Sequence, residues 1–283
     1  MLVITEPTAM AAWSDGHRIA GRRIAVVPTM GALHEGHLLL VDAARRQADV
    51  VVVTIFVNPL QFERENDLDA YPRRLAADLD ACRSRAVDAV YAPSVVDMYP
   101  PGFETHVEPG GTAAVLEGRH RPGHFRGVTT VVAKLFGATR PHLAIFGQKD
   151  HQQLAVVRRM TIDLDMGIEI VGHPTVRDAD GLALSSRNRR LSPEQRAAAV
   201  CVPRALQRMC ALAESGVRDA EELVEAGRAV VADEPLARCE YLEIVEPDTL
   251  DRLVAIDRRA IALAAVWFGD VRLIDNTELT PPP

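Results

Sequence analysis

Strands that alternate with helices are the feature that most constrains how this chain can fold. The run from 50 to 57 is nearly unbroken in β-branched residues, which is typical of a parallel strand covered on both faces. Apolar and amphipathic runs before and after it predict further strands and helices. We expect strands at 23–29, 89–92, 142–146 and 168–171, an extended piece at 105–108, and helices at 35–48, 72–85, 128–138 and 151–165. This alternation predicts an α/β domain with a doubly wound, Rossmann-like parallel sheet.

The pattern changes after Pro174, which predicts a second domain. The segment 178–192 is rich in Asp, Gly, Ser, Arg and Asn and is expected to be a loop. It ends in a serine followed by a proline, a favourable start for a helix. After it we expect helices at 193–214 and 219–233 and strands at 239–245, 260–268 and 271–275. We therefore predict a Rossmann-like domain over residues 1–175 and a smaller α+β domain over 176–283.

Composition excludes several classes of protein. The net charge of −7 argues against a surface that coats nucleic acid, because such a surface needs a basic stripe. No apolar run is long enough to span a bilayer, and no signal segment follows the first residue. The four cysteines form no C-x-x-C pair and no metal-ligand spacing. We expect them to be reduced core thiols in a cytoplasmic protein.

Lysine is rare in this chain. Of the 32 basic residues only Lys134 and Lys149 are lysines, and the others are arginines. Lysine offers a compact, rotating ammonium where arginine offers a wide planar fork. Lys149 lies just after an expected buried strand, so we predict that it contacts a phosphate, although both lysines could be remnants of codon drift. The role of Lys134 is left open.

The densest chemical signal is the segment PTMGALHEGH at 28–37. Gly31 lets the chain turn after a strand, and His34 and His37 share one face of the first helical turn. The helix N-terminus attracts anions and the imidazoles add donors, which predicts a polyphosphate cradle without a Walker loop. The alternative is a helix cap with two surface histidines. The segment resembles the signature of the nucleotidyltransferase superfamily, which includes the class I aminoacyl-tRNA synthetases and implies transfer at the α-phosphate of ATP.

A second signal is the segment SSRN at 185–188. Two hydroxyls and a guanidinium on a loop at the expected domain junction could close over phosphates and neutralise developing charge. The alternative is a solvated loop with a helix cap. The segment resembles the mobile signature loop of the class I synthetases.

Three more segments complete a family pattern. They are IFVNPLQF at 55–62, RPGHFRGV at 121–128 and FGQKDHQQ at 146–153. The first and the last follow expected strands, at the edge where α/β sheets bind ligands. Taken together in their order along the chain, from 28–37 to 185–188, the five segments resemble the pantothenate synthetase family. The resemblance implies a ligase that joins pantoate to β-alanine with ATP, through a bound pantoyl adenylate, and that releases AMP and pyrophosphate.

The resemblance also implies which residues bind the nucleotide. His34, His37 and Lys149 would be catalytic, with His37 in the role of proton donor. The nucleotide-binding residues would be Met30, His34, His37 and Lys149 at the phosphates, Gly147 and Asp150 at the ribose, Val176 at the adenine, and Leu184, Ser185, Ser186 and Arg187 on the phosphate side.

For the acid substrate the resemblance implies two glutamines. Gln61 and Gln153 would bind pantoate, and Gln61 would also contact β-alanine. Neutral amides can hold hydroxyls and a carboxylate without a cation that would weaken the carboxylate as a nucleophile. Taken alone, Gln153 could equally be a helix-surface residue. Asn58 could orient the same pocket or merely cap a strand end.

The family pattern further implies Mg²⁺ and a homodimer. Asp78 is the candidate metal ligand, but Ala77 precedes it, so the paired carboxylates of relatives are not available here. Magnesium keeps much of its shell as water and phosphate, so one carboxylate could suffice. The alternative for Asp78 is an ordinary exposed helix acid. His120 and His124 could neutralise pyrophosphate or pack at a dimer face.

Two other functions compete with the ligase. A nucleotidyltransferase that stops after adenylylating its acceptor would need His34 and His37 but not the two glutamines. A catalytically idle nucleotide-binding regulatory module is the other possibility. The presence of both histidines, Lys149 and Arg187 counts against it. No partner other than small molecules and a second copy of the chain is expected.

Overall fold

The chain divides into two compact units in the computed structural model, which describes residues 1–62, 68–69 and 71–280. The first unit comprises Met1–Gln148 and Gln152–Pro174, and the second comprises Lys149–His151 and Thr175–Pro283. No helix in the described part of the chain is both long and apolar enough to cross a membrane.

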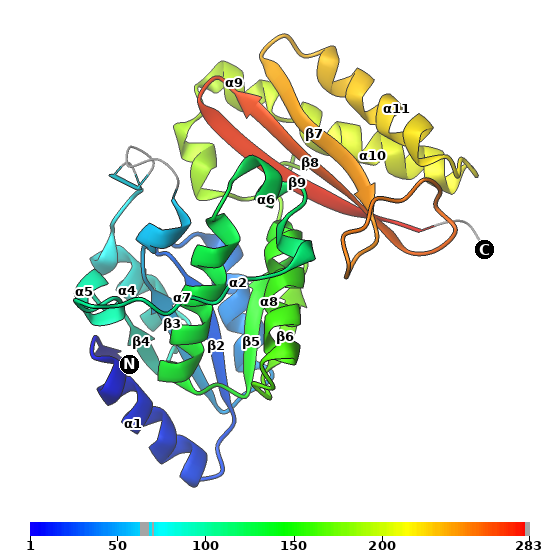
Figure 1. Cartoon of the computed structure of the whole chain (residues 1–283). Helices are drawn as coiled ribbons and strands as arrows, with labels where there is room; N and C mark the ends of the chain where they lie inside the picture. Colours follow the sequence, from blue (N-terminus) through cyan, green and yellow to red (C-terminus); the bar gives the residue numbers. More distant parts are fainter. Residues whose placement is uncertain (63–67, 70, 281–283) are drawn as a thin grey trace. The chain divides into compact units, whose positions relative to one another are not determined.

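The first unit is built on a six-stranded sheet in the order β1-β4-β3-β2-β5-β6, and each pair of neighbours is parallel (Figure 1). The strands are β1 (Leu2–Ile4), β2 (Ile24–Thr29), β3 (Val50–Ile55), β4 (Ala89–Tyr91), β5 (Leu143–Gly147) and β6 (Glu169–His173). The expected doubly wound, Rossmann-like sheet is confirmed. The carboxyl ends of the central strands β2, β3 and β5 carry the segments in which the chemistry is predicted.

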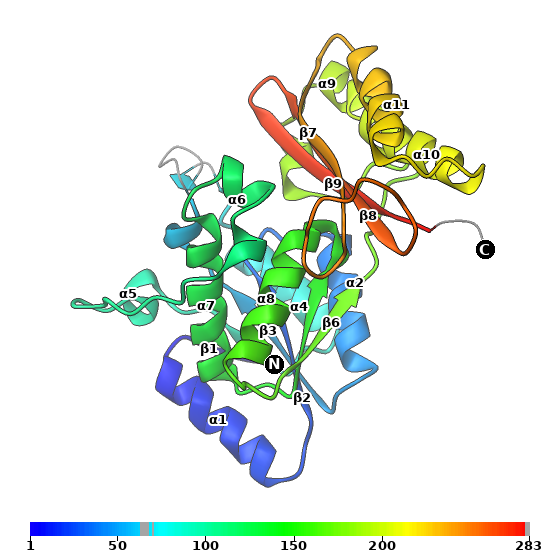
Figure 2. The same ribbon diagram turned by 45° about the vertical axis from the view of Figure 1, so that its right-hand side comes forward.

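Helices cover both faces of this sheet (Figures 1 and 2). The helices are α1 (Pro7–Ile19), α2 (Glu35–Arg45), α4 (Leu75–Ser84), α5 (Val95–Met98), α6 (Glu117–His120), α7 (His124–Thr139) and α8 (His151–Asp163). Alternate residues of β2 enter two different cores. Ile24 and Val26 pack with α1, α7 and α8, whereas Ala25 and Val27 pack with α2 and α4. A strand buried on both faces explains the unbroken apolar runs in the sequence.

Two expectations for the first unit need correction. The segment 105–108, expected as an extended piece, lies in neither a helix nor a strand. β1 and α1 lie outside the expected elements; β1 is a three-residue edge strand whose exposed side chains carry little signal. The helix expected at 128–138 begins four residues earlier, at His124, after Gly123 in a left-handed conformation. Most of the other bounds differ by one to three residues, as helix and strand ends commonly do.

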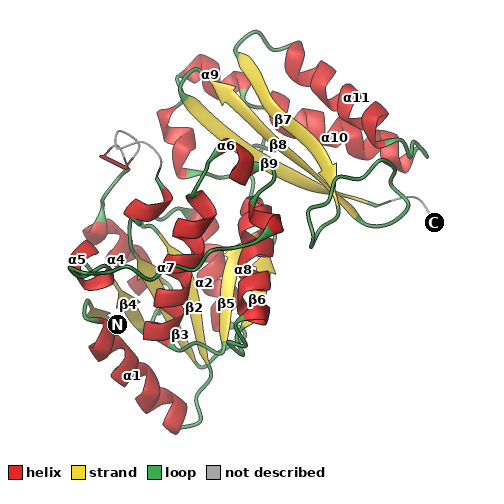
Figure 3. Cartoon of the chain, in the orientation of Figure 1, coloured by secondary structure: helices red, strands yellow, loops and turns green. Residues whose placement is uncertain are grey.

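The second unit is a three-stranded antiparallel sheet in the order β7-β8-β9 with helices against it (Figure 3). Its elements are α9 (Pro193–Ala198), α10 (Cys201–Glu214), α11 (Ala220–Ala232), β7 (Ala237–Val245), β8 (Ala260–Phe268) and β9 (Val271–Leu279). The single helix expected at 193–214 is wrong. Pro203 lacks an N–H group and its ring would collide with the carbonyl of Ala199, so the helix breaks there and restarts.

Candidate active site

The turn after β2 is held by side chains that accept hydrogen bonds from its backbone. Gly31 and Ala32 both have positive φ, +84° and +51°, a strained conformation for alanine. The N–H group of Gly31 donates to Thr29 Oγ1 at 3.1 Å. The N–H groups of Ala32 and Leu33 donate to the two oxygens of Asp78, at 2.9 and 2.8 Å. These three hydrogen bonds to Thr29 and Asp78 therefore hold the backbone of the turn in its conformation.

Asp78 is buried, with 3% of its surface exposed, so the interpretation as an exposed helix acid is wrong. Both of its oxygens are engaged by backbone donors, which leaves the carboxylate poorly suited to bind a metal ion. Among the residues that the structure describes, no group of three or more His, Cys, Asp or Glu side chains could hold a metal ion. Asp78 as a metal ligand therefore stays a prediction that the hydrogen bonds of its carboxylate do not favour.

His34 and His37 meet at the start of α2. His34 is the N-cap residue, and its backbone N–H donates to Nδ1 of His37 at 3.3 Å. The ring centroids are 4.0 Å apart. Because Nδ1 of His37 accepts a hydrogen bond, the proton of the neutral ring belongs on Nε2, which can then donate to a ligand. The rings of His34 and His37 therefore lie next to each other at the start of α2, as their spacing in the sequence predicted.

Gln61 is brought to the same edge of the sheet by the segment after β3. It ends the short 3-10 helix η1 (Pro59–Gln61), and its Nε2 lies 3.2 Å from Sδ of Met30, in the turn after β2. Asn58, only 1% exposed, is the N-cap residue of η1 and donates from Nδ2 to Gln61 Oε1 at 2.9 Å. Both interpretations of Asn58 are therefore compatible with the structure, since it caps η1 and contacts Gln61.

Tyr99, which the sequence reasoning did not single out, joins this group. Its hydroxyl donates to Oδ1 of Asn58 at 2.7 Å. Burial raises the pKa of Tyr99 above its ordinary value, so the hydroxyl keeps the proton that it donates. Its ring packs against those of Phe56 and Phe103. Tyr99 lies 41 positions from Asn58 in the sequence, and no local pattern connects the two.

The segment 121–128 also supports Gln61. Nδ1 of His124 lies 2.9 Å from the backbone oxygen of Gln61, and a guanidinium nitrogen of Arg121 donates to the same oxygen at 3.2 Å. His124 is 7% exposed, whereas His120 is exposed. His124 therefore packs within the first unit. Lys134, to which the sequence assigned no role, places its Nζ 5.3 Å from the centroid of the Phe103 ring.

The two neighbouring glutamines of α8 differ in their surroundings. Gln152 is 2% exposed, and its amide bonds to three backbone groups, those of Thr112, Val115 and Glu117. Gln153 is half-buried, and within the described ranges of the chain no backbone group bonds to its amide. The structure thus gives Gln152 a structural task and leaves Gln153 as the candidate for ligand contact.

Gly147 ends β5, and the 3-10 helix η3 (Gln148–Asp150) follows it. Lys149 and Asp150 belong to the second unit, where the backbone oxygen of Lys149 accepts a hydrogen bond from Nδ2 of Asn276 at 2.8 Å. His151 is held in the same unit by a contact of 2.8 Å between its Nε2 and the oxygen of Pro247.

The remaining predicted residues lie on one hairpin of the second unit and on the short helix that follows it. The N–H group of Leu184 donates to the oxygen of Val176 at 2.9 Å. Arg177 makes two hydrogen bonds to the buried carboxylate of Asp275, at 2.7 and 2.9 Å, which ties the hairpin to β9. The 3-10 helix η4 (Ser186–Arg190) follows, with Ser185 as its N-cap. Val176 and Leu184 are thus neighbours, with Ser185, Ser186 and Arg187 directly after them.

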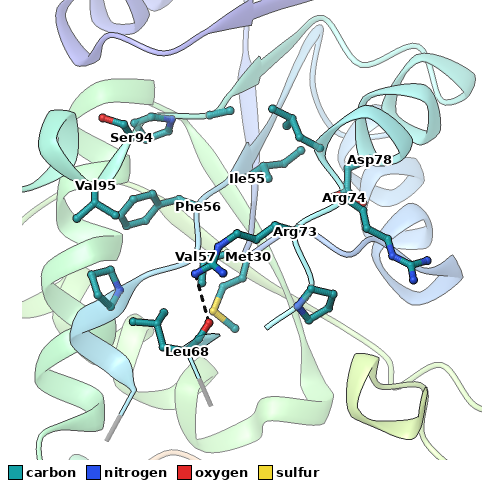
Figure 4. A pocket seen from close by; sticks show the side chains of 16 residues that line it. Met30, Ile55, Phe56, Val57, Leu68, Arg73, Arg74, Asp78, Ser94 and Val95 are labelled. Atoms are coloured by element: carbon teal, nitrogen blue, oxygen red, sulfur yellow. Dashed lines mark hydrogen bonds between the residues drawn. The ribbon is translucent and has the colours of Figure 1, made fainter. Parts of the chain in front are cut away.

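A largely apolar pocket of about 290 Å³ adjoins the turn after β2 (Figure 4). Met30, Ile55 and Phe56 contribute to its wall, and Asp78 lies at its border. Arg73 reaches across it and donates to the backbone oxygen of Leu68 at 3.3 Å. Met30 thus both lines this pocket and contacts the amide of Gln61.

The thiols are poor candidates for a nucleophile. All four cysteines are free. Cys82 and Cys201 are buried, and burial raises the pKa of Cys82 to about 11 and that of Cys201 to about 12. Cys210 and Cys239 are only half-buried, so the expectation of core thiols holds fully for two of the four.

Comparison with known proteins gives one consistent result. A family model described as pantoate-beta-alanine ligase matches residues 2–278. The chain is 50% identical to the pantothenate synthetase of Thioalkalivibrio sulfidiphilus (strain HL-EbGR7) over 285 residues, which is 100% of this chain and 99% of that protein. It is 53% identical to the pantothenate synthetase of Roseiflexus sp. (strain RS-1), over 90% of this chain and 91% of that protein.

Two solved structures are similar over almost the whole chain. Pantothenate synthetase from Thermus thermophilus has a TM-score of 0.94 at 45% identity, covering 99% of this chain and 100% of that one. Pantoate-beta-alanine ligase from Francisella tularensis, complexed with beta-gamma ATP and beta-alanine, has a TM-score of 0.81 at 34% identity, covering 98% and 97%.

Proposed function

The chain belongs to the pantoate–β-alanine ligase family, and from this premise we propose that it condenses pantoate with β-alanine, using ATP, to give pantothenate, AMP and pyrophosphate. The observation that carries the proposal is the meeting of two segments at the carboxyl edge of the sheet. The turn after β2 supplies the two imidazoles and Met30, and the segment after β3 supplies the amide of Gln61 in contact with Met30.

The first chemical step that we propose is adenylylation of pantoate. A carboxylate oxygen attacks the α-phosphorus of ATP, the bond from that phosphorus to the bridging oxygen breaks, and pyrophosphate leaves. Donors fixed in advance stabilise such a transition state because they need no reorganisation when charge develops. Nε2 of His37, together with His34 and the ammonium of Lys149, would supply these donors. Gly147 and Asp150 at the ribose, Val176 at the adenine and Leu184 to Arg187 at the phosphates complete the proposed nucleotide site.

The second step is aminolysis. The free amine of β-alanine attacks the acyl carbon of the adenylate, the amide bond forms, the bond to the AMP oxygen breaks, and the amine loses a proton. AMP makes the acyl group reactive, so no acyl-enzyme is required. The buried thiols of Cys82 and Cys201 support this route, because their raised pKa values disfavour the nucleophilic thiolate. Gln61 and Gln153 are the residues proposed to hold pantoate.

Mg²⁺ enters this proposal only as the ion that accompanies the ATP phosphates, where it would neutralise their charge. We assign no protein ligand to it, because both oxygens of Asp78 are engaged by the backbone. A cytoplasmic location and a homodimer stay predictions from the sequence.

The test is formation of AMP from ATP, pantoate and β-alanine, with each substrate omitted in turn. Labelled pyrophosphate should exchange into ATP when pantoate is present and β-alanine is absent. With pantoate labelled by ¹⁸O in its carboxylate, one labelled oxygen should reach AMP after the full reaction. Exchange that requires β-alanine, or AMP without label, would overturn the two-step route even if pantothenate is made.

The histidines provide the link between this activity and the site. His34→Ala and His37→Ala should each lower turnover by about 10²–10³-fold, as when one preorganised donor is lost. His17→Ala is the matched control, since His17 lies on α1, outside the proposed site. If turnover falls tenfold or less in both His34→Ala and His37→Ala, and both variants fold normally, the two histidines act only as a helix cap.

A further inference from the structure

The side-chain amide of Asn58 makes hydrogen bonds with both of its ends. Nδ2 donates to Gln61 Oε1 at 2.9 Å and to the backbone oxygen of Gly127 at 3.0 Å. Oδ1 accepts from the hydroxyl of Tyr99 at 2.7 Å and from the N–H group of Leu60 at 3.2 Å. Since Asn58 is only 1% exposed, these four bonds use the whole capacity of its amide.

These partners allow a single orientation of the Asn58 amide. If its oxygen and nitrogen were exchanged, the NH₂ group would face the N–H of Leu60, and the oxygen would face the carbonyl of Gly127. Two buried donor–acceptor pairs would become repulsive pairs, which is costly in a place that water does not reach. The backbone therefore determines which end of Asn58 faces Gln61, and the Tyr99 hydroxyl adds a donor on the acceptor side.

The orientation of Asn58 in turn determines that of Gln61. Because Nδ2 of Asn58 donates to Oε1 of Gln61, the opposite end of the Gln61 amide is its NH₂ group, which is the end near Sδ of Met30. Sulfur is only a weak acceptor, so the N–H groups of Gln61 can instead donate to a ligand oxygen, which accepts more strongly. A ligand that reaches Gln61 thus meets donors, which match a carboxylate or a hydroxyl oxygen.

One backbone approach makes this arrangement possible. A Cβ atom on Gly127 would lie 2.2 Å from the oxygen and 2.5 Å from the carbonyl carbon of Leu60. Only glycine at this position lets α7 come close enough to η1 for the carbonyl of Gly127 to accept from Asn58.

We propose that Tyr99 is a positioning residue for pantoate binding, which acts through Asn58 to hold the Gln61 amide with its N–H donors toward the acid substrate. The inference rests on the proposed function, because it takes pantoate as the ligand of Gln61. Tyr99 does not touch the ligand in this scheme. Its effect passes entirely through the two hydrogen bonds that connect it with Gln61.

The test is Tyr99→Phe in the full-length enzyme, assayed for pantothenate formation. The phenyl ring keeps the packing against Phe56 and Phe103 and removes only the donor. We expect KM for pantoate to rise about three- to tenfold, the size of one neutral hydrogen bond, while KM for ATP stays unchanged. Tyr91→Phe is the matched control, because Tyr91 is a fully buried tyrosine of β4 outside this chain of bonds, and its KM for pantoate should not change.

A double-mutant cycle separates positioning from general packing. In a Gln61→Ala background the chain of bonds ends at Asn58, so adding Tyr99→Phe should raise KM for pantoate no further. An equal rise in both backgrounds, an equal rise in the two KM values, or no rise at all would overturn the inference. Absence of pantothenate formation by the unaltered enzyme would instead overturn the proposed function, so the two failures are distinguishable.

Discussion

Replacing the buried carboxylate of Asp78 is expected to destabilise the turn that carries the two histidines. Its oxygens accept from the N–H groups of Ala32 and Leu33 at 2.9 and 2.8 Å, and Asp78 is 3% exposed. Asp78→Asn keeps the shape of the side chain but replaces one acceptor with an NH₂ group. That group would face a backbone N–H, so one buried donor would lose its acceptor.

The magnitude follows from these two bonds. A hydrogen bond to a charged group contributes about 1.5–3 kcal/mol, and a buried donor without an acceptor costs about 1–3 kcal/mol. Asp78→Asn should therefore lower the free energy of unfolding of the first unit by about 2–4 kcal/mol. Asp80→Asn, on the exposed side of the same helix, is the matched control. Asp80 pairs with Arg83 at the surface, and a change below about 1 kcal/mol is expected.

The assay is urea unfolding followed by tryptophan fluorescence. The two tryptophans lie in different units, Trp13 on α1 and Trp267 on β8. A Trp267→Phe background therefore lets Trp13 report on the first unit alone, which matters because two units need not unfold together. The midpoint should fall for Asp78→Asn while the slope m stays constant.

One result would refute this reasoning about Asp78. If Asp78→Asn unfolds at the same urea concentration as Asp80→Asn, the two backbone bonds do not contribute as argued. If the same variant also needs more Mg²⁺ for half-maximal activity, the carboxylate acts as the metal ligand that the sequence first suggested.

Three further substitutions test the site. Lys149→Arg should lower kcat by about 10²-fold, because a wide guanidinium cannot occupy an ammonium-sized phosphate site, and retention of most activity would refute this. Gln153→Ala should raise KM for pantoate about tenfold without changing the ATP affinity measured by calorimetry. Gln152→Ala should mainly lower the thermal unfolding temperature. A loss of stability in Gln153→Ala together with a raised KM for pantoate in Gln152→Ala would contradict both assignments. Gly127→Ala should lower stability by about 1–3 kcal/mol and raise KM for pantoate, because its Cβ would lie 2.2 Å from the Leu60 oxygen. An unchanged unfolding temperature would contradict that close approach.

The sheet could be predicted from the sequence because its strands are buried on both faces. β3 and β5 appear as apolar runs of the right length, and the alternation of such strands with helices restricts the topology to few possibilities. The break before Pro203 could have been predicted as well, since proline in the third position of α10 forbids a continuous helix. β1 carried no comparable signal, because an exposed edge strand of three residues depends on its partner β4.

The candidate site was predictable where its chemistry is local. His34 and His37 lie within one helical turn, so their spacing alone places them together. Tyr99 and Asp78 were not predictable in their observed tasks, because each acts on a backbone or side-chain group more than forty positions away. The residue types of Tyr99 and Asp78 did not indicate these tasks either. A carboxylate in a helix is taken for a surface acid until the fold shows what its oxygens contact.

The scarcity of lysine makes this protein unusually simple to footprint. An amine-selective reagent has two side-chain targets, Lys134 and Lys149, besides the α-amino group of the first residue. Lys134, which belongs to α7, lies against the ring of Phe103, and Lys149 lies in η3 directly after β5. The mass of the intact protein then counts the labels, and one peptide map assigns each of them. If a ligand lowers the labelling of Lys149 while the labelling of Lys134 stays constant, the experiment reports that the ligand occupies the surroundings of Lys149. Lys134 then serves as the internal reference in the same chain.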